Sequence, residues 1–189
     1  SRPLQIAKHP EDLVYYWDQR LCAADRNGEF AALFWTHDLA TKCDLNVHFR
    51  RATLTDSDAG GLKITGDGIR QTTLPGQIGA PLQLADGRLL AFVVDRRGPC
   101  TMTLWISHDD GHAWPEHERL VIHNHEELAA VAPGGTAIDF NQYWEDMGKW
   151  SFGHPSLLSL GDSEVLCAWY AGTPTCMSIH WARVKVPGC

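Results

Sequence analysis

Residues 80–94 read APLQLADGRLLAFVV, in which two apolar runs flank an Asp-Gly turn. An Asp-Gly or Asn-Gly pair between apolar runs is among the strongest short signals for a β-hairpin. The same plan recurs as QRLCAADRNGEFAALFW at residues 19–35, with Asn-Gly at the turn, and as HPSLLSLGDSEVLCAWY at residues 154–170, with Gly-Asp-Ser in its place. The chain therefore contains a threefold repeat of a hairpin unit.

A third strand is predicted after each hairpin, beyond a polar loop that ends in a cysteine. These strands begin at Cys43, Cys100 and Cys176, and apolar and polar side chains alternate along them, as in a half-buried strand. A unit of about 50 residues with three or four antiparallel strands is typical of a β-propeller blade. A β-sandwich also has many short strands, but it would not repeat this plan three times. We therefore predict an all-β region with blades at residues 14–66, 67–122 and 150–189 and an insertion at 123–149.

Composition and charge exclude several classes of function. The 189 residues carry a formal net charge of −7, which argues against nucleic-acid binding because phosphate contacts require clustered Lys and Arg. No apolar run approaches the roughly 20 residues that span a bilayer, and residues 1–8 lack the pattern of a signal peptide. The six cysteines form no CxxC pair, so they predict neither a zinc site nor a disulfide scaffold, and they mildly favour a reducing cytosol. No cofactor is implied.

One motif is more informative than the repeat. Residues 107–114 read SHDDGHAW, which is the pattern Ser-x-Asp-x-Gly-x-x-Trp placed directly after a predicted third strand. The pattern suits a tight turn, since the Asp109 carboxylate can accept backbone N–H groups, Gly111 supplies a positive φ and Trp114 packs the turn against the blade. With Ser107 as its first position, it matches the Asp-box, or BNR repeat, of sialidase-like propellers.

The chain resembles the C-terminal half of bacterial BNR-repeat proteins of the sialidase or neuraminidase family. Beyond the Asp-box, the resemblance rests on WDQR at 17–20, DLNVHF at 44–49, ADGRLL at 85–90 and FGHPS at 152–156. It implies a six-bladed propeller, of which the chain supplies three four-stranded blades, and a glycan-directed site at the centre of one face.

Three blades leave two apolar blade faces open, and exposed apolar surfaces promote association. Two copies related by a twofold axis would supply the six blades of a closed ring, so we predict a homodimer. The third repeat lacks a fourth strand in the sequence. Residues 3–7 are a candidate to supply it, in the same chain or in the partner.

The family's chemistry implies candidate residues. Sialidases hold the sugar carboxylate with three arginines and use a tyrosine nucleophile assisted by a glutamate, with an aspartate as acid/base. The sequence holds only part of this set, and the family's N-terminal Phe/Tyr-Arg-Ile-Pro motif is absent. Propeller topology gathers functional residues at the starts of the innermost strands and in the loops between second and third strands. The catalytic candidates are Asp18, Asp95 and Tyr170, and the ligand-binding candidates are Arg20, Arg96, Arg97 and His154.

Each candidate also has a structural interpretation. Residues 95–97 fit a solvated hairpin tip, residues 17–20 an ion pair at the start of a strand, and Tyr170 an aromatic residue that packs a blade. Trp144 and Trp150 either stack on a sugar ring or hold the insertion in place. Residues 123–126 (HNHE) include metal-ligand types but fit a surface loop, and the three strand-starting cysteines are expected to be buried rather than to share a metal.

Two functions follow from these observations. The first is a sialidase-like propeller that binds or acts on a carbohydrate, as an incomplete or divergent glycoside hydrolase of exo-sialidase type. The second is a non-catalytic propeller scaffold for protein–protein contacts, which the partial catalytic set favours.

Overall fold

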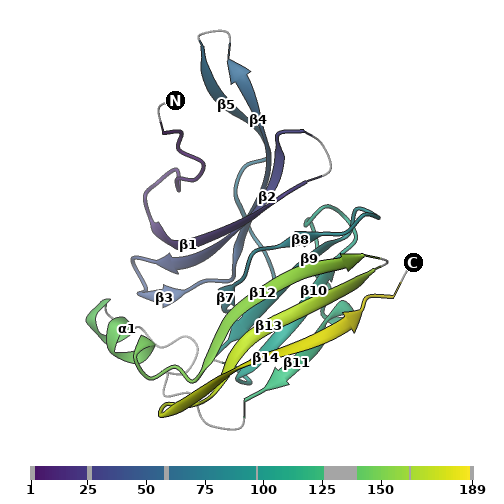
Figure 1. The fold of residues 1–189 in the computed structure, drawn as a ribbon. Coiled ribbons are helices and arrows are strands. Elements are labelled where there is room, and N and C mark those ends of the chain that lie inside the picture. The colour runs from purple at the N-terminus through teal and green to yellow at the C-terminus, as the bar shows by residue number, and fades with distance from the viewer. Residues whose placement is uncertain are drawn as a thin grey trace.

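The computed structural model describes residues 3–24, 27–57, 60–96, 98–125, 140–161 and 163–187. Within these ranges the protein is all-β, with three antiparallel sheets and one short α-helix (Figure 1). We name the sheets A, B and C in chain order. Within the same ranges, no sheet closes on itself to form a barrel.

Sheet A is a meander in which successive long strands pair antiparallel. It begins at Val14 and includes the short strand β6, which pairs with β4. Its strands are β1 (Val14–Ala23), β2 (Glu29–Asp38), β3 (Cys43–Asp44), β4 (His48–Ser57), β5 (Gly61–Gly66) and β6 (Arg70–Gln71).

Sheet B is also an antiparallel meander. Its first strand is split into two short pieces, both of which pair with β9. The Asp-Gly turn that the sequence predicts joins the second piece to β9. The elements are β7 (Gln77–Ile78), β8 (Leu82–Gln83), β9 (Leu89–Asp95), β10 (Thr101–Ser107), the 3-10 turn η1 (Glu116–Glu118) and β11 (Leu120–Asn124).

Sheet C has three long strands, so the prediction of a four-stranded third blade is wrong for the described residues. The Val186 N–H donates to the Ser163 carbonyl at 2.8 Å, which continues the β13–β14 pairing by one residue and starts no fourth strand. Residues 3–7 do not join any sheet either. The strands are β12 (Phe152–Gly161), β13 (Glu164–Thr173) and β14 (Cys176–Lys185).

The insertion contains a helix that the sequence analysis did not predict, α1 (Phe140–Met147). Tyr143 and Met147 are four residues apart, a spacing that places both side chains on one face of a helix. This spacing is the signal that identifies the helix in retrospect.

Sheet B is buried on both sides because alternate residues of β9 belong to two different cores. Leu89, Ala91 and Val93 pack with β2 of sheet A in the first core. The intervening Leu90, Phe92 and Val94 pack with β13 of sheet C in the second core. The residues from β2 and β13 in these cores are Ala31, Leu33 and Trp35, and Val165, Cys167 and Trp169.

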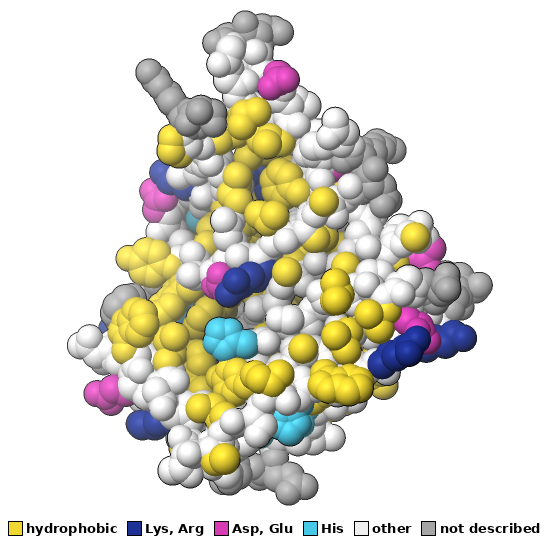
Figure 2. All heavy atoms as spheres, viewed as in Figure 1, with side chains coloured by type: hydrophobic (Ala, Val, Ile, Leu, Met, Phe, Trp, Pro, Cys, Tyr) yellow, Lys and Arg dark blue, Asp and Glu magenta, His cyan; other side chains and the backbone are white. Residues whose placement is uncertain are grey.

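Sheet C is buried on one side only. Along β13, Val165, Cys167 and Trp169 are buried, whereas the alternate residues Leu166 and Ala168 are partly exposed. Figure 2, which views the molecule as in Figure 1, shows hydrophobic side chains spread over the strands of sheet C, with charged side chains near its margin. This side of sheet C therefore lacks a packing partner among the described residues.

The first strands of the three sheets lie beside one another. β7 and β8 contact β1, and β8 also contacts β12. As a result, residues at the starts of β1 and β12 approach residues from the β9–β10 turn, although they are far apart in the sequence.

Candidate ligand-binding site

A cavity of about 360 Å³ opens where these first strands meet α1. Its walls come from β1 and β2 of sheet A, from β7 and the β9–β10 turn of sheet B, from α1, and from β12 and β13 of sheet C. All three sheets thus contribute to one site.

The cavity brings together five of the candidates named from the sequence: Asp18, Arg20, Arg96, His154 and Tyr170. Arg97 lies outside the described residues. Asp95 does not line the cavity, because its carboxylate accepts the Gly98 N–H at 2.8 Å and so closes the β9–β10 turn.

Arg96 is the buried cation of the cavity, with 7% of its surface exposed. Its guanidinium carbon lies 4.0 Å from the centre of the Trp150 ring, a cation–π distance, and its terminal nitrogens donate hydrogen bonds to Gln77 Oε1 and to the Phe152 carbonyl. Burial lowers the pKa of Arg96 to about 10, although the Tyr170 hydroxyl opposes that shift. The guanidinium therefore stays charged at neutral pH; Gln77 and Phe152 offer it uncharged oxygens, and the Tyr170 hydroxyl is a further hydrogen-bond partner.

A distortion at the start of β12 makes room for this guanidinium. Gly153 has a φ of 151°, and a β-carbon there would collide with Nη2 of Arg96. The pairing of β12 with β13 is irregular between Gly153 and Ser156, and His154 has a φ of 50°. The His154 and Tyr170 rings come to 5.4 Å between centroids. Such bulges are common next to functional sites.

Asp18 and Arg20 form an ion pair on β1. Nε and Nη2 of Arg20 each lie 2.9 Å from Oδ2 of Asp18. Both side chains are substantially exposed, so the pair adds little to stability on its own. The pair presents one charge of each sign to the cavity. This arrangement agrees with the structural interpretation of residues 17–20 as an ion pair at the start of a strand.

A buried carboxylate fixes α1 against sheet A. Asp44 accepts hydrogen bonds from Trp35 Nε1 at 3.1 Å and from the Tyr143 hydroxyl, and its Oδ1 lies 2.8 Å from Nδ1 of His37. Tyr143 belongs to α1 and the other residues to sheet A. This docking places Trp144, whose side chain is 57% exposed, beside the cavity.

Several lining residues escaped the sequence analysis. Trp17 and Trp35 lie on adjacent strands with ring centroids 5.4 Å apart, and Gln77 holds Arg96. Trp17 stood in a stretch quoted for the resemblance, but nothing in the sequence pattern separates Trp35 or Gln77 from ordinary strand residues.

The Asp-box forms the turn that its pattern predicts, between β10 and β11. Asp109 Oδ1 accepts the Ala113 N–H and the Ser107 hydroxyl, each at 2.8 Å, and the Gly111 N–H donates to Ser107 Oγ at 2.9 Å. Partial burial alone would raise the pKa of Asp109, but these hydrogen bonds outweigh it and lower the pKa. Trp114 is buried.

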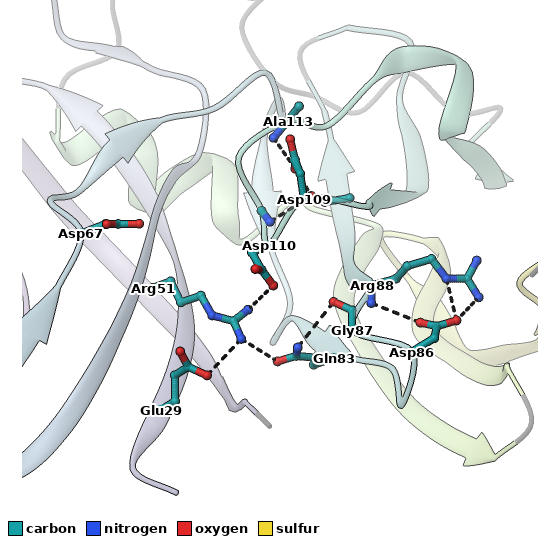
Figure 3. A network of polar contacts seen from close by, with 12 residues as sticks. Glu29, Arg51, Asp67, Gln83, Asp86, Gly87, Arg88, Asp109, Asp110 and Ala113 are labelled. Carbon is teal, nitrogen blue, oxygen red and sulfur yellow. Dashed lines mark hydrogen bonds and ion pairs between the residues drawn. The ribbon is translucent and has the colours of Figure 1, made fainter. Parts of the chain in front are cut away.

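The Asp-box lies at the other end of sheet B from the cavity. Figure 3 shows Asp110 of this turn bound to Arg51, which also bridges Glu29 and Gln83. Gln83 precedes β9, whereas Arg96 directly follows it, so the length of β9 separates this polar network from the cavity. The network joins sheets A and B and contributes nothing to the cavity.

The residue types considered for metal binding do not assemble a centre. His123 Nε2 lies 3.3 Å from His125 Nδ1, and Glu126 lies outside the described residues. The expectation that the strand-starting cysteines are buried is wrong, since Cys176 is exposed and Cys43 and Cys100 are partly exposed. Among the residues with described placement, no three or more His, Cys, Asp or Glu side chains are arranged to hold a metal.

The helices in the same ranges are too short or too polar to cross a bilayer.

Comparisons with known proteins bear on the fold alone. No protein-family profile matches the sequence, and no curated protein matches it. The chain is similar to a crystal structure described as an unknown function protein from Dyadobacter fermentans DSM 18053, with a TM-score of 0.57 and 17% sequence identity. The match covers 93% of this chain and 40% of that one, so the three sheets span less than half of the similar protein.

Proposed function

We propose that this chain is half of a sialidase-like β-propeller and binds an acidic carbohydrate in the cavity around Arg96. Two features support the propeller. The three sheets repeat one antiparallel order with their first strands side by side, and sheet B carries an Asp-box turn in the expected place. Closed propellers of four to eight blades have this radial repetition.

The observation that carries the binding proposal is the buried charge of Arg96. A charge removed from water is costly unless it is paired and hydrogen-bonded. A guanidinium has five N–H donors; the Gln77 and Phe152 oxygens that accept from Arg96 are uncharged, and the Tyr170 hydroxyl is a further hydrogen-bond partner. A ligand carboxylate would supply the opposite charge and can accept two parallel N–H bonds.

The surroundings of Arg96 favour a ring-shaped polar ligand over a simple ion. Trp150 stacks on the guanidinium, and the exposed Trp144 offers a second aromatic surface for the apolar face of a sugar ring. His154 and Tyr170 add polar groups that could hydrogen-bond ring hydroxyls. A few placed polar groups among aromatic walls are typical of small-molecule sites.

Binding is better supported than hydrolysis. Glycosidases of the common type need two carboxylates, and the sialidase exception needs a tyrosine supported by a glutamate. Among the described lining residues, Asp18 is the one carboxylate, and it is paired with Arg20. Tyr170 lies near a cation and a histidine, without a glutamate lining the described part of the cavity.

Calorimetric titration with N-acetylneuraminic acid and glucuronic acid, against neutral N-acetylglucosamine, tests the proposal. We expect the acidic sugars alone to bind, and Arg96→Lys to weaken binding about tenfold or more, because lysine keeps the charge but loses the planar fork. Lysine is used because alanine at this buried position would also remove packing. Arg119→Lys is the matched control, since Arg119 also lies over a tryptophan ring, Trp105, but away from the cavity.

Equal affinity for the neutral sugar, or unchanged affinity in Arg96→Lys, would contradict the proposal. A fluorogenic sialoside assay on the same preparations separates binding from hydrolysis.

A further inference from the structure

Each sheet has two faces, and the sheet contacts within the chain distinguish them: the upstream face points toward the preceding sheet, and the downstream face points toward the following sheet. The downstream face of each sheet packs on the upstream face of the sheet that follows it in the chain. On β9, Leu89, Ala91 and Val93 form the upstream face, against sheet A. Residues of the opposite parity on β9 form the downstream face, against sheet C. Unlike faces meet in both contacts.

The downstream face of sheet C is the first open face. Its strand pairing sets Ile179 opposite Tyr170, Trp181 opposite Ala168, and Leu158 opposite Leu166. Ile179 is 77% exposed and Trp181 69% exposed, far more than is usual for such side chains in a strand. This is the apolar surface of sheet C seen in Figure 2.

The upstream face of sheet A is the second open face. Leu21 pairs with Ala32 on the side of β2 that points away from sheet B, and it is 49% exposed. Leu54 and Leu62 extend this face on β4 and β5 and are also exposed. Its centre is covered by residues 5–10, where the Ile6 carbonyl accepts a hydrogen bond from Arg50. The exposed leucines border this covered part.

We propose that a second copy of this chain covers these surfaces head to tail, with the downstream face of sheet C on the upstream face of sheet A of the other copy. The argument is continuity: this contact would repeat, for a third time, the unlike-face packing found twice within the chain. A twofold arrangement closes when both copies exchange both contacts, which removes both open faces at once. A contact between like faces would leave sheet A open.

The association would also border the cavity. Tyr170 lies on the downstream face of sheet C and lines the cavity with Arg96. A partner sheet packed on that face would therefore add a wall next to Tyr170. This inference does not rest on carbohydrate binding, because it follows from the sheet faces alone.

Sedimentation velocity at micromolar concentration tests the proposal. We expect a species of twice the 21.0 kDa chain mass for the wild-type protein. Ile179→Lys on sheet C and Leu21→Lys on sheet A should each reduce the mass to that of one chain. Met177→Lys is a second variant on sheet C, and Val121→Lys is the matched control, because Val121 is 41% exposed on the outer strand β11. Circular dichroism and the melting temperature check that each variant is folded.

A wild-type protein that sediments as a single chain overturns the proposal. So does a Leu21→Lys variant that still pairs like the wild type, since that outcome means that two sheet C faces meet each other. Loss of pairing in the folded Val121→Lys control would place the contact on the outer strands and would also overturn it.

Discussion

Replacing Trp114 with alanine tests whether the Asp-box turn joins sheets A and B. Trp114 is 3% exposed, and its ring lies 6.4 Å from that of Phe49 on β4, at 71° between planes. The Thr73 hydroxyl also donates to the Trp114 carbonyl at 2.9 Å. Removing the indole would leave a cavity in the first core, between the turn and the neighbouring sheet.

The expected cost follows from this burial. A buried tryptophan replaced by alanine loses about 3–5 kcal/mol, and for a chain of this length each kcal/mol corresponds to about 2–4 °C in melting temperature. We therefore expect Trp114→Ala to melt about 6–20 °C below the wild type. Because native domains are stable by only about 5–15 kcal/mol, this loss is a large fraction of the total.

Urea unfolding followed by circular dichroism measures the change directly. Trp144→Ala is the matched control, since it makes the same chemical change at an exposed tryptophan and should shift stability little. Trp114→Phe should fall between the wild type and Trp114→Ala, because a ring remains to pack on Phe49. A Trp114→Ala variant as stable as the wild type would refute the structural role of the turn.

The remaining predictions concern pH and the docking of α1. Burial, with repulsion from His9, lowers the pKa of His48 to about 4, below the value of about 6.5 in an unfolded chain. The unfolded chain therefore binds the proton more readily, so stability should be full above about pH 6.5 and should fall as the pH drops toward 4. His48→Gln should flatten that fall in urea unfolding, and an unchanged pH profile would count against it. Asp44→Asn should speed hydrogen exchange in α1, because it weakens a buried hydrogen-bond acceptor; exchange as slow as in the exposed Asp67→Asn control would contradict this.

The sheet arrangement was largely readable from the sequence because local signals agreed with long-range packing. The Asp-Gly pair at residues 86–87 predicts a hairpin, and the structure places that turn between β8 and β9. The half-buried pattern expected of the third strands is not seen, because β10 is buried throughout and β14 is mostly exposed. The three predicted hairpins do form, as the antiparallel pairs β1–β2, β8–β9 and β12–β13. Such turn and strand signals depend on residues close together in the sequence, so they can be recognised without knowledge of the rest of the fold.

The details of the cavity were less accessible because they depend on distant contacts. Asp95 and Arg96 are neighbours in the sequence, yet Asp95 closes a turn while Arg96 is buried under Trp150. The docking of α1 depends on Asp44, which is 99 residues from Tyr143. No local pattern encodes such a pairing.

The shared use of β9 has a consequence for how the protein comes apart. Because neighbouring residues of this one strand serve separate cores, sheets A and C do not need each other, but both need sheet B. Either outer sheet could detach and leave one core intact, whereas melting of sheet B removes both cores in a single step. Partial opening should therefore proceed from the outer sheets inward, and amides of β9 and β10 should be among the last to exchange with solvent.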